Sequence, residues 1–168
     1  MKIIITESQY KKLFKEEKEQ KVLRIPSLKI FDENIVVAWN NLQKFLEKKG
    51  NPPYSIGDDL FLEGTSIESL GNLISVGGFM DLSHTDIQSL GNLKSVGRDL
   101  NLYGTPIKSL GNLQSVGGNL NLIHTPIESL GNLTSVGGEL DLLGTPLSTM
   151  YSEKQIRQMV DVGSKIYL

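Results

Sequence analysis

Two histidines, His84 and His124, are the side chains whose type and spacing first suggest metal or acid–base chemistry. Imidazole is a common metal ligand, but both residues stand at the same position of a repeated pattern, two repeats apart. If each repeat adds one strand to a sheet, about 9.6 Å separates them. Zinc–nitrogen bonds are about 2.0–2.1 Å long. One ion therefore cannot bind both, and we interpret them as surface histidines.

The rest of the sequence offers no other reactive centre. It has no cysteine, which excludes disulfides, thiolate metal sites and cysteine nucleophiles. It contains no phosphate-binding Gly-Lys-Ser/Thr loop and no plausible Ser/His/Asp set. A net charge of -2 and a pI near 5.7 argue against a globally basic nucleic-acid binder. We therefore predict a protein that is not an enzyme and uses no cofactor and no metal.

The elements that position the side chains come from a repeat of 20 residues. Each unit contains Leu-x-Leu, whose leucines point to one face of a short strand while the middle residue points to the other. Stacked units make a parallel sheet with leucine ladders inside it, and glycines permit tight corners. A lone unit buries too little apolar surface to offset the entropy of ordering its backbone, so neighbours must stabilise it. The units begin at Leu60, Met80, Leu100, Leu120 and Leu140.

The string Leu-x-Leu-x-x-Thr-x-Ile-x-x-Leu resembles the core of leucine-rich repeats, with Thr where that family usually has Asn. The unit length and the Ser-Leu-Gly-Asn-Leu continuation resemble the short repeats of bacterial effector proteins. The string Ser-Val-Gly-Gly-x-Leu-x-Leu also resembles the L domains of cell-surface receptors. The resemblance covers about residues 55–149 and implies a solenoid whose strand face binds partners. The expected fold is an α/β repeat solenoid of the leucine-rich-repeat type, with a parallel sheet of about six short strands and helical caps at both ends.

The same resemblance gives the repeated threonines an inward position, from which they would bond neighbouring backbone. A regular row of outward hydroxyls could instead bind ice, but the inward position favours a structural role. We interpret the repeated asparagines as buried turn amides, which need hydrogen-bond partners. The threonines are Thr65, Thr85, Thr105, Thr125 and Thr145, and the asparagines are Asn72, Asn92, Asn112 and Asn132.

Residues 1–54 are predicted to form a helical extension and cap before five repeats in residues 55–149. A capping-box pattern at Thr6–Gln9 opens a polar helix to about residue 19, and residues 22–31 are expected to be an extended connector. Asp32 is predicted to cap a second helix, which Gly50 and the following prolines end. The apolar face of that helix is expected to be core rather than a ligand site, and it comprises Ile35, Ala38, Trp39, Leu42, Phe45 and Leu46.

Residues 150–168 are predicted to complete a single continuous domain with a helix and a final strand. Ser152 and Gln155 mark the start of a helix to about Val160. Residues 162–168 then repeat the pattern of residues 136–142, which predicts a sixth rung. An uncovered edge strand is a pairing site for another chain. A homodimer through this C-terminal edge strand is therefore one hypothesis.

The middle residue of each strand and the residues beside the leucines face outwards and differ between repeats. They combine aromatic and aliphatic groups with carboxylates, a composition typical of protein-binding patches. An acidic rim would speed association with a basic protein surface, which is the preferred partner. The residues predicted to bind it are Phe61, Phe79, Asp81, Asp99, Asn101, Tyr103, Asn121, Ile123, Asp141 and Leu143.

Two functions remain open at this point. The first is a protein-interaction module, an adaptor or inhibitor, that works through the strand face. The second is a structural or assembly component, for example of a phage particle, that works through its ends; the opening Met1–Phe14 resembles the starts of small tailed-bacteriophage proteins. Nucleic-acid contact by the lysines of residues 11–29 is a weaker third reading, because a solvated helix face explains them. The absence of a signal peptide and of an apolar run long enough for a membrane span predicts a cytoplasmic protein with no membrane contact.

Overall fold

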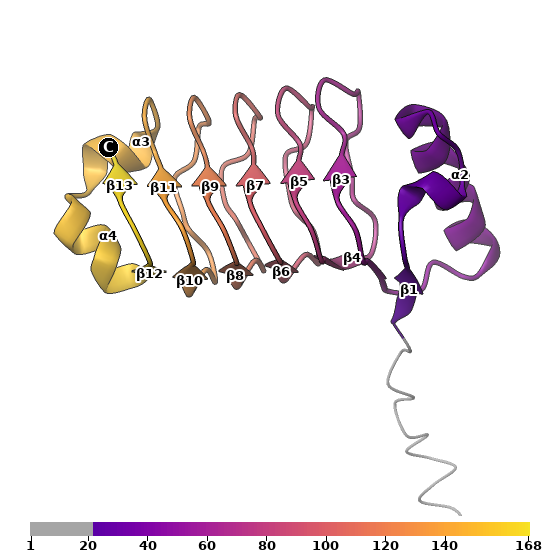
Figure 1. Cartoon of the computed structure of the whole chain (residues 1–168). Helices are drawn as coiled ribbons and strands as arrows, with labels where there is room; N and C mark the ends of the chain where they lie inside the picture. The colour runs from indigo at the N-terminus through magenta and orange to yellow at the C-terminus, as the bar shows by residue number, and fades with distance from the viewer. Residues whose placement is uncertain (1–21) are drawn as a thin grey trace, which may run out of the picture.

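The chain is a parallel β-solenoid of about four turns, seen in a computed structural model that describes residues 22–168 (Figure 1). Between the repeats, register partners in neighbouring strands lie 20 residues apart, as in the pair Leu100 and Leu120. Each turn therefore corresponds to one repeat of the sequence. The predicted helix of residues 6–19 lies outside the described residues.

One side of the coil is the six-stranded sheet that the Leu-x-Leu pattern predicted. In the repeats the two apolar residues of each strand segment point inwards and are buried, as for Leu60 and Leu62; in the last strand Ile166 is buried but Leu168 is exposed. The residue between them points outwards, so that this sheet presents an outer face along the whole coil, toward the viewer in Figure 1. Its strands are β3 (Leu60–Phe61), β5 (Met80–Asp81), β7 (Leu100–Asn101), β9 (Leu120–Asn121), β11 (Leu140–Asp141) and β13 (Ile166–Tyr167).

A second parallel sheet has seven strands, four of which contain the Ser-Val step of a repeat, and the sequence analysis did not predict it. Each valine is buried inside the coil. The glycine after it allows the backbones to stack closely, since a Cβ on Gly97 would lie 2.1 Å from the Gly77 oxygen. The strands are β1 (Leu23–Ile25), β2 (Tyr54–Ile56), β4 (Leu73–Val76), β6 (Ser95–Val96), β8 (Ser115–Val116), β10 (Ser135–Val136) and β12 (Asp161–Val162).

The third side of the coil is mostly irregular and begins at the repeated threonines. Thr105 is buried, and its hydroxyl donates a 2.8 Å hydrogen bond to the carbonyl of Leu102. The inward position predicted for the threonines is thus correct, with the bond made inside the same repeat. The asparagines differ from the prediction, because Asn92, Asn112 and Asn132 are exposed. They still find the hydrogen-bond partners that were expected, because Asn92 Nδ2 donates to Asn72 Oδ1 at 3.1 Å and Asn112 Nδ2 donates to the carbonyl of Gly91 at 3.0 Å, both in the preceding repeat.

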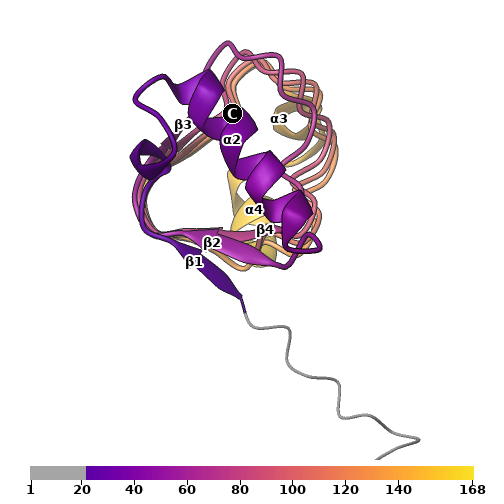
Figure 2. The same cartoon turned by 90° about the vertical axis from the view of Figure 1, so that its right-hand side faces the viewer.

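Helices lie at both ends of the coil, and Figure 2 shows α2 (Ile35–Lys48) across the N-terminal end. It is preceded by β1 and by a short 3-10 helix, η1 (Leu28–Ile30), where an entirely extended connector was expected. The helix cap was also predicted wrongly. Asn34 Oδ1 accepts hydrogen bonds from the first-turn N–H groups, while Asp32 bonds the N–H of Asn34. Two residues of extra chain after Asp32 make Asn34 the one that meets the free helical donors.

At the C-terminal end, α3 (Pro146–Met150) and α4 (Glu153–Met159) replace the third side of the last repeat. The sequence predicted α4 but not α3. Gln155 Oε1 accepts a hydrogen bond from the N–H of Ser152, as the start signal required. The chain then forms β12 and β13, so the sixth rung is present. Within the described residues no helix is both long and apolar enough to cross a membrane.

Candidate functional site

The outer face of the six-stranded sheet carries all the residues predicted to bind a partner, and several of them have structural roles. In four strands the outward residue is Asp or Asn, and its Oδ1 accepts a hydrogen bond from the N–H two residues later. The bond lengths are 2.9 Å for Asp81, 3.1 Å for Asn101, 3.0 Å for Asn121 and 3.1 Å for Asp141. These side chains fix the bend that ends each strand. Their acidity and polarity therefore do not by themselves indicate binding.

A second set of side chains links successive repeats at the corner before each strand. Asp59 Oδ1 accepts from the N–H of Phe79 at 2.7 Å, and Asp99 Oδ1 accepts from the N–H of Asn119 at 2.7 Å. Each oxygen lies over the glycine of the next repeat. A Cβ on Gly118 would be 1.9 Å from Asp99 Oδ1, and one on Gly78 would be 2.1 Å from Asp59 Oδ1. An Asp or Asn at the corner thus requires glycine at the facing position of the following repeat, as Gly78 faces Asp59 and Gly118 faces Asp99.

Three neighbouring residues differ from the types that the bends and corners of the other repeats carry. Phe61 replaces the bend-fixing Asp or Asn, and Phe79 replaces the corner Asp or Asn. Their rings stack, with centroids 5.6 Å apart and planes inclined by 27°. Because Phe79 has no oxygen to place over the next repeat, residue 98 can carry a side chain, and it is Arg98. The three residues line a hollow of about 540 Å³ together with Gly97, Gly117 and Gly118.

A separate aromatic row runs along the tight bends that follow the strands. The Tyr103 ring lies between two histidine rings, with centroids 5.0 Å from His84 and 5.6 Å from His124. Both histidines are exposed and have left-handed backbones, with φ of 55° and 56°. This conformation is unfavourable for a side-chain-bearing residue. Glycine fills the equivalent place in the other repeats, including Gly104, over which the His84 ring leans.

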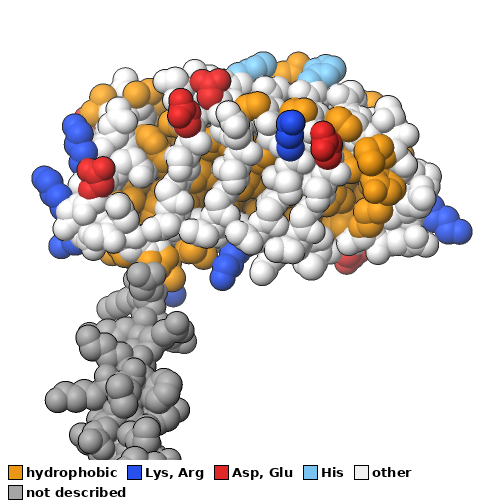
Figure 3. All heavy atoms as spheres, turned by 180° about the vertical axis from the view of Figure 1, so that it is seen from behind, with side chains coloured by type: hydrophobic (Ala, Val, Ile, Leu, Met, Phe, Trp, Pro, Cys, Tyr) orange, Lys and Arg blue, Asp and Glu red, His pale blue; other side chains and the backbone are white. Residues whose placement is uncertain are grey.

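The structure therefore divides the predicted site into parts. Phe61 and Phe79 form one cluster, while Tyr103 belongs to the histidine row; Ile123 is half-buried and Leu143 is 43% exposed. The sequence analysis treated the histidines as isolated and did not include Arg98. The sequence did mark the two histidines and Arg98, because each stands at a position of the repeat where other units have glycine. As seen from the third side (Figure 3), histidine side chains lie along the upper edge of the molecule.

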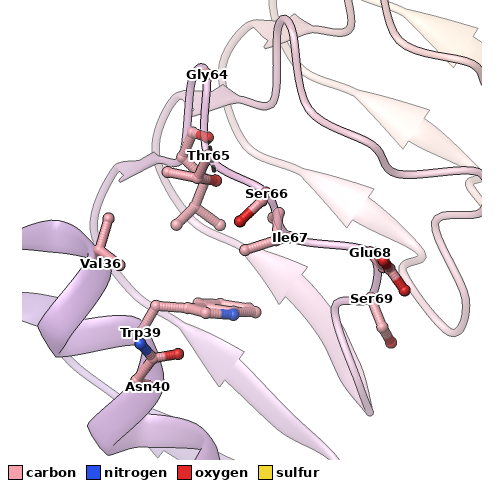
Figure 4. A pocket seen from close by; sticks show the side chains of 10 residues that line it. Val36, Trp39, Asn40, Gly64, Thr65, Ser66, Ile67, Glu68 and Ser69 are labelled. Carbon is pink, nitrogen blue, oxygen red and sulfur yellow. Dashed lines mark hydrogen bonds between the residues drawn. The ribbon is translucent and has the colours of Figure 1, made fainter.

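A cleft of about 480 Å³ separates α2 from the first repeat (Figure 4). Trp39 extends from the helix to form its floor and is only 5% exposed, which confirms that it is core. The opposite wall includes Thr65 and Ile67, which are half-buried, whereas their equivalents Thr85 and Ile87 in the next repeat are buried. Because α2 covers the first repeat less completely than one repeat covers another, the cleft is a consequence of how the coil starts.

No cluster of three or more His, Cys, Asp or Glu side chains that could hold a metal ion occurs in residues 22–168. In comparisons with known proteins, no protein-family model, no curated protein and no solved structure matches this chain.

Proposed function

We propose that the chain is a non-enzymatic protein-interaction module, an adaptor or inhibitor, that binds a protein partner through the outer face of its six-stranded sheet. The observation that supports this is the cluster of Phe61, Phe79 and Arg98. In most other repeats the first two positions carry an Asp or Asn whose side chain accepts a backbone hydrogen bond. The third position is a glycine that leaves room for the corner Asp or Asn. Phe61 and Phe79 give up hydrogen bonds of the scaffold, and together with Arg98 they make a hollowed surface with an apolar centre.

The geometry of this cluster suits a protein anchor. Phe61 is 52% exposed and stacked on Phe79, so its ring is available yet held in one orientation. Large aromatic side chains beside a concavity carry much of the affinity in protein interfaces. The adjacent glycines leave space for one apolar side chain of the partner. Asp59 and Asp99 border the hollow, and each uses only Oδ1 for the backbone bond.

The remaining carboxylate oxygens favour a basic partner surface. Asp81 and Asp141 add carboxylates along the same face. Opposite charge raises the association rate and orients the partner, while the apolar anchor supplies most of the affinity. We therefore propose a partner segment with one apolar side chain flanked by Lys or Arg.

The leucine-rich-repeat assignment and a capping role for the end helices are part of the same proposal. The inward leucines and the exposed strand face support the first. The burial of Ala38, Trp39 and Leu42 of α2, and of Ile156 of α4, supports the second. Both helices cover core side chains that would otherwise be open to water.

The test is capture of a partner from extract of the source cells with the intact chain and with two variants. Phe61→Asn, Phe79→Asn, Arg98→Gly gives this corner the residue types of the other repeats, so it should fold and lose the partner. Tyr103→Ser, Ile123→Ser removes apolar groups elsewhere on the face and should weaken capture less. Equal capture by the intact chain and the first variant would show that the cluster does not bind. Circular dichroism verifies that each variant is folded.

An assembly function through the ends of the coil is the second candidate. Strand β13 favours it, because no other strand of residues 22–168 pairs with its outer edge. Such a function requires an interaction that is independent of the strand face.

A further inference from the structure

The two sheets end differently at the C-terminal end of the coil, and Arg157 makes the difference. In inner repeats, carbonyls of the seven-stranded sheet accept hydrogen bonds from the following repeat, as Val136 does from Gly163 at 2.9 Å and Gly138 from Ser164 at 3.0 Å. In the last repeat the guanidinium of Arg157 takes this role. It donates to the carbonyl of Val162 at 2.9 Å and to that of Ser164 at 2.6 Å.

The guanidinium is held in place by its own partner. Arg157 Nε donates to Glu153 Oε1 at 2.9 Å, one helical turn earlier in α4. A planar, always-charged group with fixed donor directions can replace two backbone N–H groups, which a lysine ammonium cannot do in the same geometry. Arg157 therefore closes the β12 edge against pairing with another strand.

The edge of the six-stranded sheet has no such closure in the described part of the chain. There the N–H groups of Leu140 and Leu142 donate to the carbonyls of Lys165 and Tyr167, both at 2.9 Å. The register places Ile166 and Leu168 at the equivalent positions of β13. Their N–H groups consequently point away from β11, and no acceptor in residues 22–168 receives them.

The surroundings of β13 suit a macromolecular contact. Met150, Met159 and Leu168 are 56%, 48% and 38% exposed, and hydrophobic side chains gather at this end in Figure 3. The charged groups of residues 150–168 are of both signs: Glu153, Lys154, Arg157, Asp161 and Lys165. Two copies of this end would therefore meet without strong like-charge repulsion.

We propose that a second copy of this chain binds here, through antiparallel pairing of β13 with β13 of the partner. A strand offering both donors and a carbonyl is self-complementary under a two-fold axis, which closes the assembly at two copies. The opposite end of another copy is a poor match, because α2 lies beyond β3 there (Figure 1). The proposal does not depend on binding at the Phe61 cluster.

Sedimentation velocity across a dilution series of the full chain tests the proposal. The intact chain should form dimers. Leu168→Pro removes the outward N–H but leaves both bonds that β13 accepts from β11, and proline is tolerated at an edge. Since each dimer loses two hydrogen bonds, its dissociation constant should rise at least about tenfold. Leu168→Ala is the matched control: it removes the same side chain, keeps the N–H and should weaken the dimer less.

Arg157→Met tests the other half of the inference. Opening the β12 edge should produce assemblies larger than the dimer, and an unchanged dimer would show that Arg157 blocks nothing. A monomeric intact chain, or equal effects of the proline and alanine variants, would refute pairing through β13. Amide hydrogen exchange gives an independent readout, because the Ile166 and Leu168 amides should become protected only when the chain is concentrated enough to dimerise.

Discussion

Where a corner carries Asp or Asn, that residue lies over a glycine of the next repeat, and we call this pairing the corner rule. It predicts a large and specific coupling between Asp99 and Gly118. An alanine at position 118 would place its Cβ 1.9 Å from Asp99 Oδ1, so the carboxylate must swing away. The 2.7 Å bond to the N–H of Asn119 is then lost. A hydrogen bond to a charged group contributes about 1.5–3 kcal/mol. Gly118→Ala should therefore lower the free energy of unfolding by about 2 kcal/mol.

A double-mutant cycle separates this loss from other effects of the added methyl group. Asp99→Ala alone removes the same hydrogen bond and should cost about as much as Gly118→Ala. Adding Gly118→Ala to Asp99→Ala should then cost at least about 1 kcal/mol less than in the intact chain, because the obstructing oxygen is gone and only the backbone atoms Asp99 N and Arg98 C, 3.0 and 3.1 Å from the new Cβ, remain close. Arg98→Ala is the control at the equivalent corner, where Phe79 leaves room for a side chain, and should change stability by less than about 0.5 kcal/mol.

Urea unfolding measures the cycle, followed by circular dichroism for the whole coil and by fluorescence of Trp39 for its N-terminal end. In a thermal scan, 2 kcal/mol corresponds to a fall in Tm of about 4–8 °C for a chain of this size. The rule is wrong if Gly118→Ala costs as much in the Asp99→Ala background as in the intact chain. The clash would then be with the backbone, and Arg98 would need another explanation.

Three further predictions follow from single contacts. Burial raises the pKa of Tyr54 to about 12, above its unfolded value near 10. The folded state therefore holds the phenol proton more tightly than the unfolded state does, which stabilises the fold fully below about pH 10 and progressively less as the pH rises toward about 12. Tyr54→Phe should flatten the alkaline decrease of Tm. Asn34→Ala should cost about 1 kcal/mol by removing the α2 cap, more than Asp32→Ala does, and urea unfolding followed by Trp39 fluorescence compares them; equal losses would contradict the cap assignment. Gly97→Ala should cost about 3 kcal/mol of stability, because its Cβ would meet a backbone oxygen of the preceding repeat. Gly64→Ala has open space around it and should cost only about 1–2 kcal/mol for its left-handed backbone. Similar losses for the two variants in calorimetry would contradict the close stacking.

The strand face could be predicted because alternation alone decides which way a side chain points. Leu100 and Leu102 are separated by one residue, so both face inwards once a strand forms. The seven-stranded sheet was missed for the opposite reason. Ser115 and Val116 are too short a run to show alternation, and they pair only because Gly117 lets the backbones approach closely. Such pairing depends on repeats that are adjacent in space.

The candidate site shows the same division. The outward direction of Phe61 and Phe79 follows from their positions in the repeat, and the sequence predicted both as binding residues. Their stacking, and the room that Phe79 leaves for Arg98, depend on contacts between repeats. The acidic residues were overinterpreted, because an Asp that binds a partner and an Asp that fixes a bend have the same pattern. Only the position of the carboxylate oxygen distinguishes them.

By itself the sequence determined the 20-residue period, the inward leucines and threonines, the sixth rung and the composition of the outer face. These properties depend on local geometry and on the period, which each repeat carries within itself. Only the tertiary structure decided which carboxylates are structural, which departures from the repeat meet in one place, and that Arg157 closes one sheet edge while no strand of residues 22–168 pairs with the outer edge of β13. Each of these depends on atoms about 20 residues apart in the chain, or in different elements, whose distances are fixed only when the repeats stack.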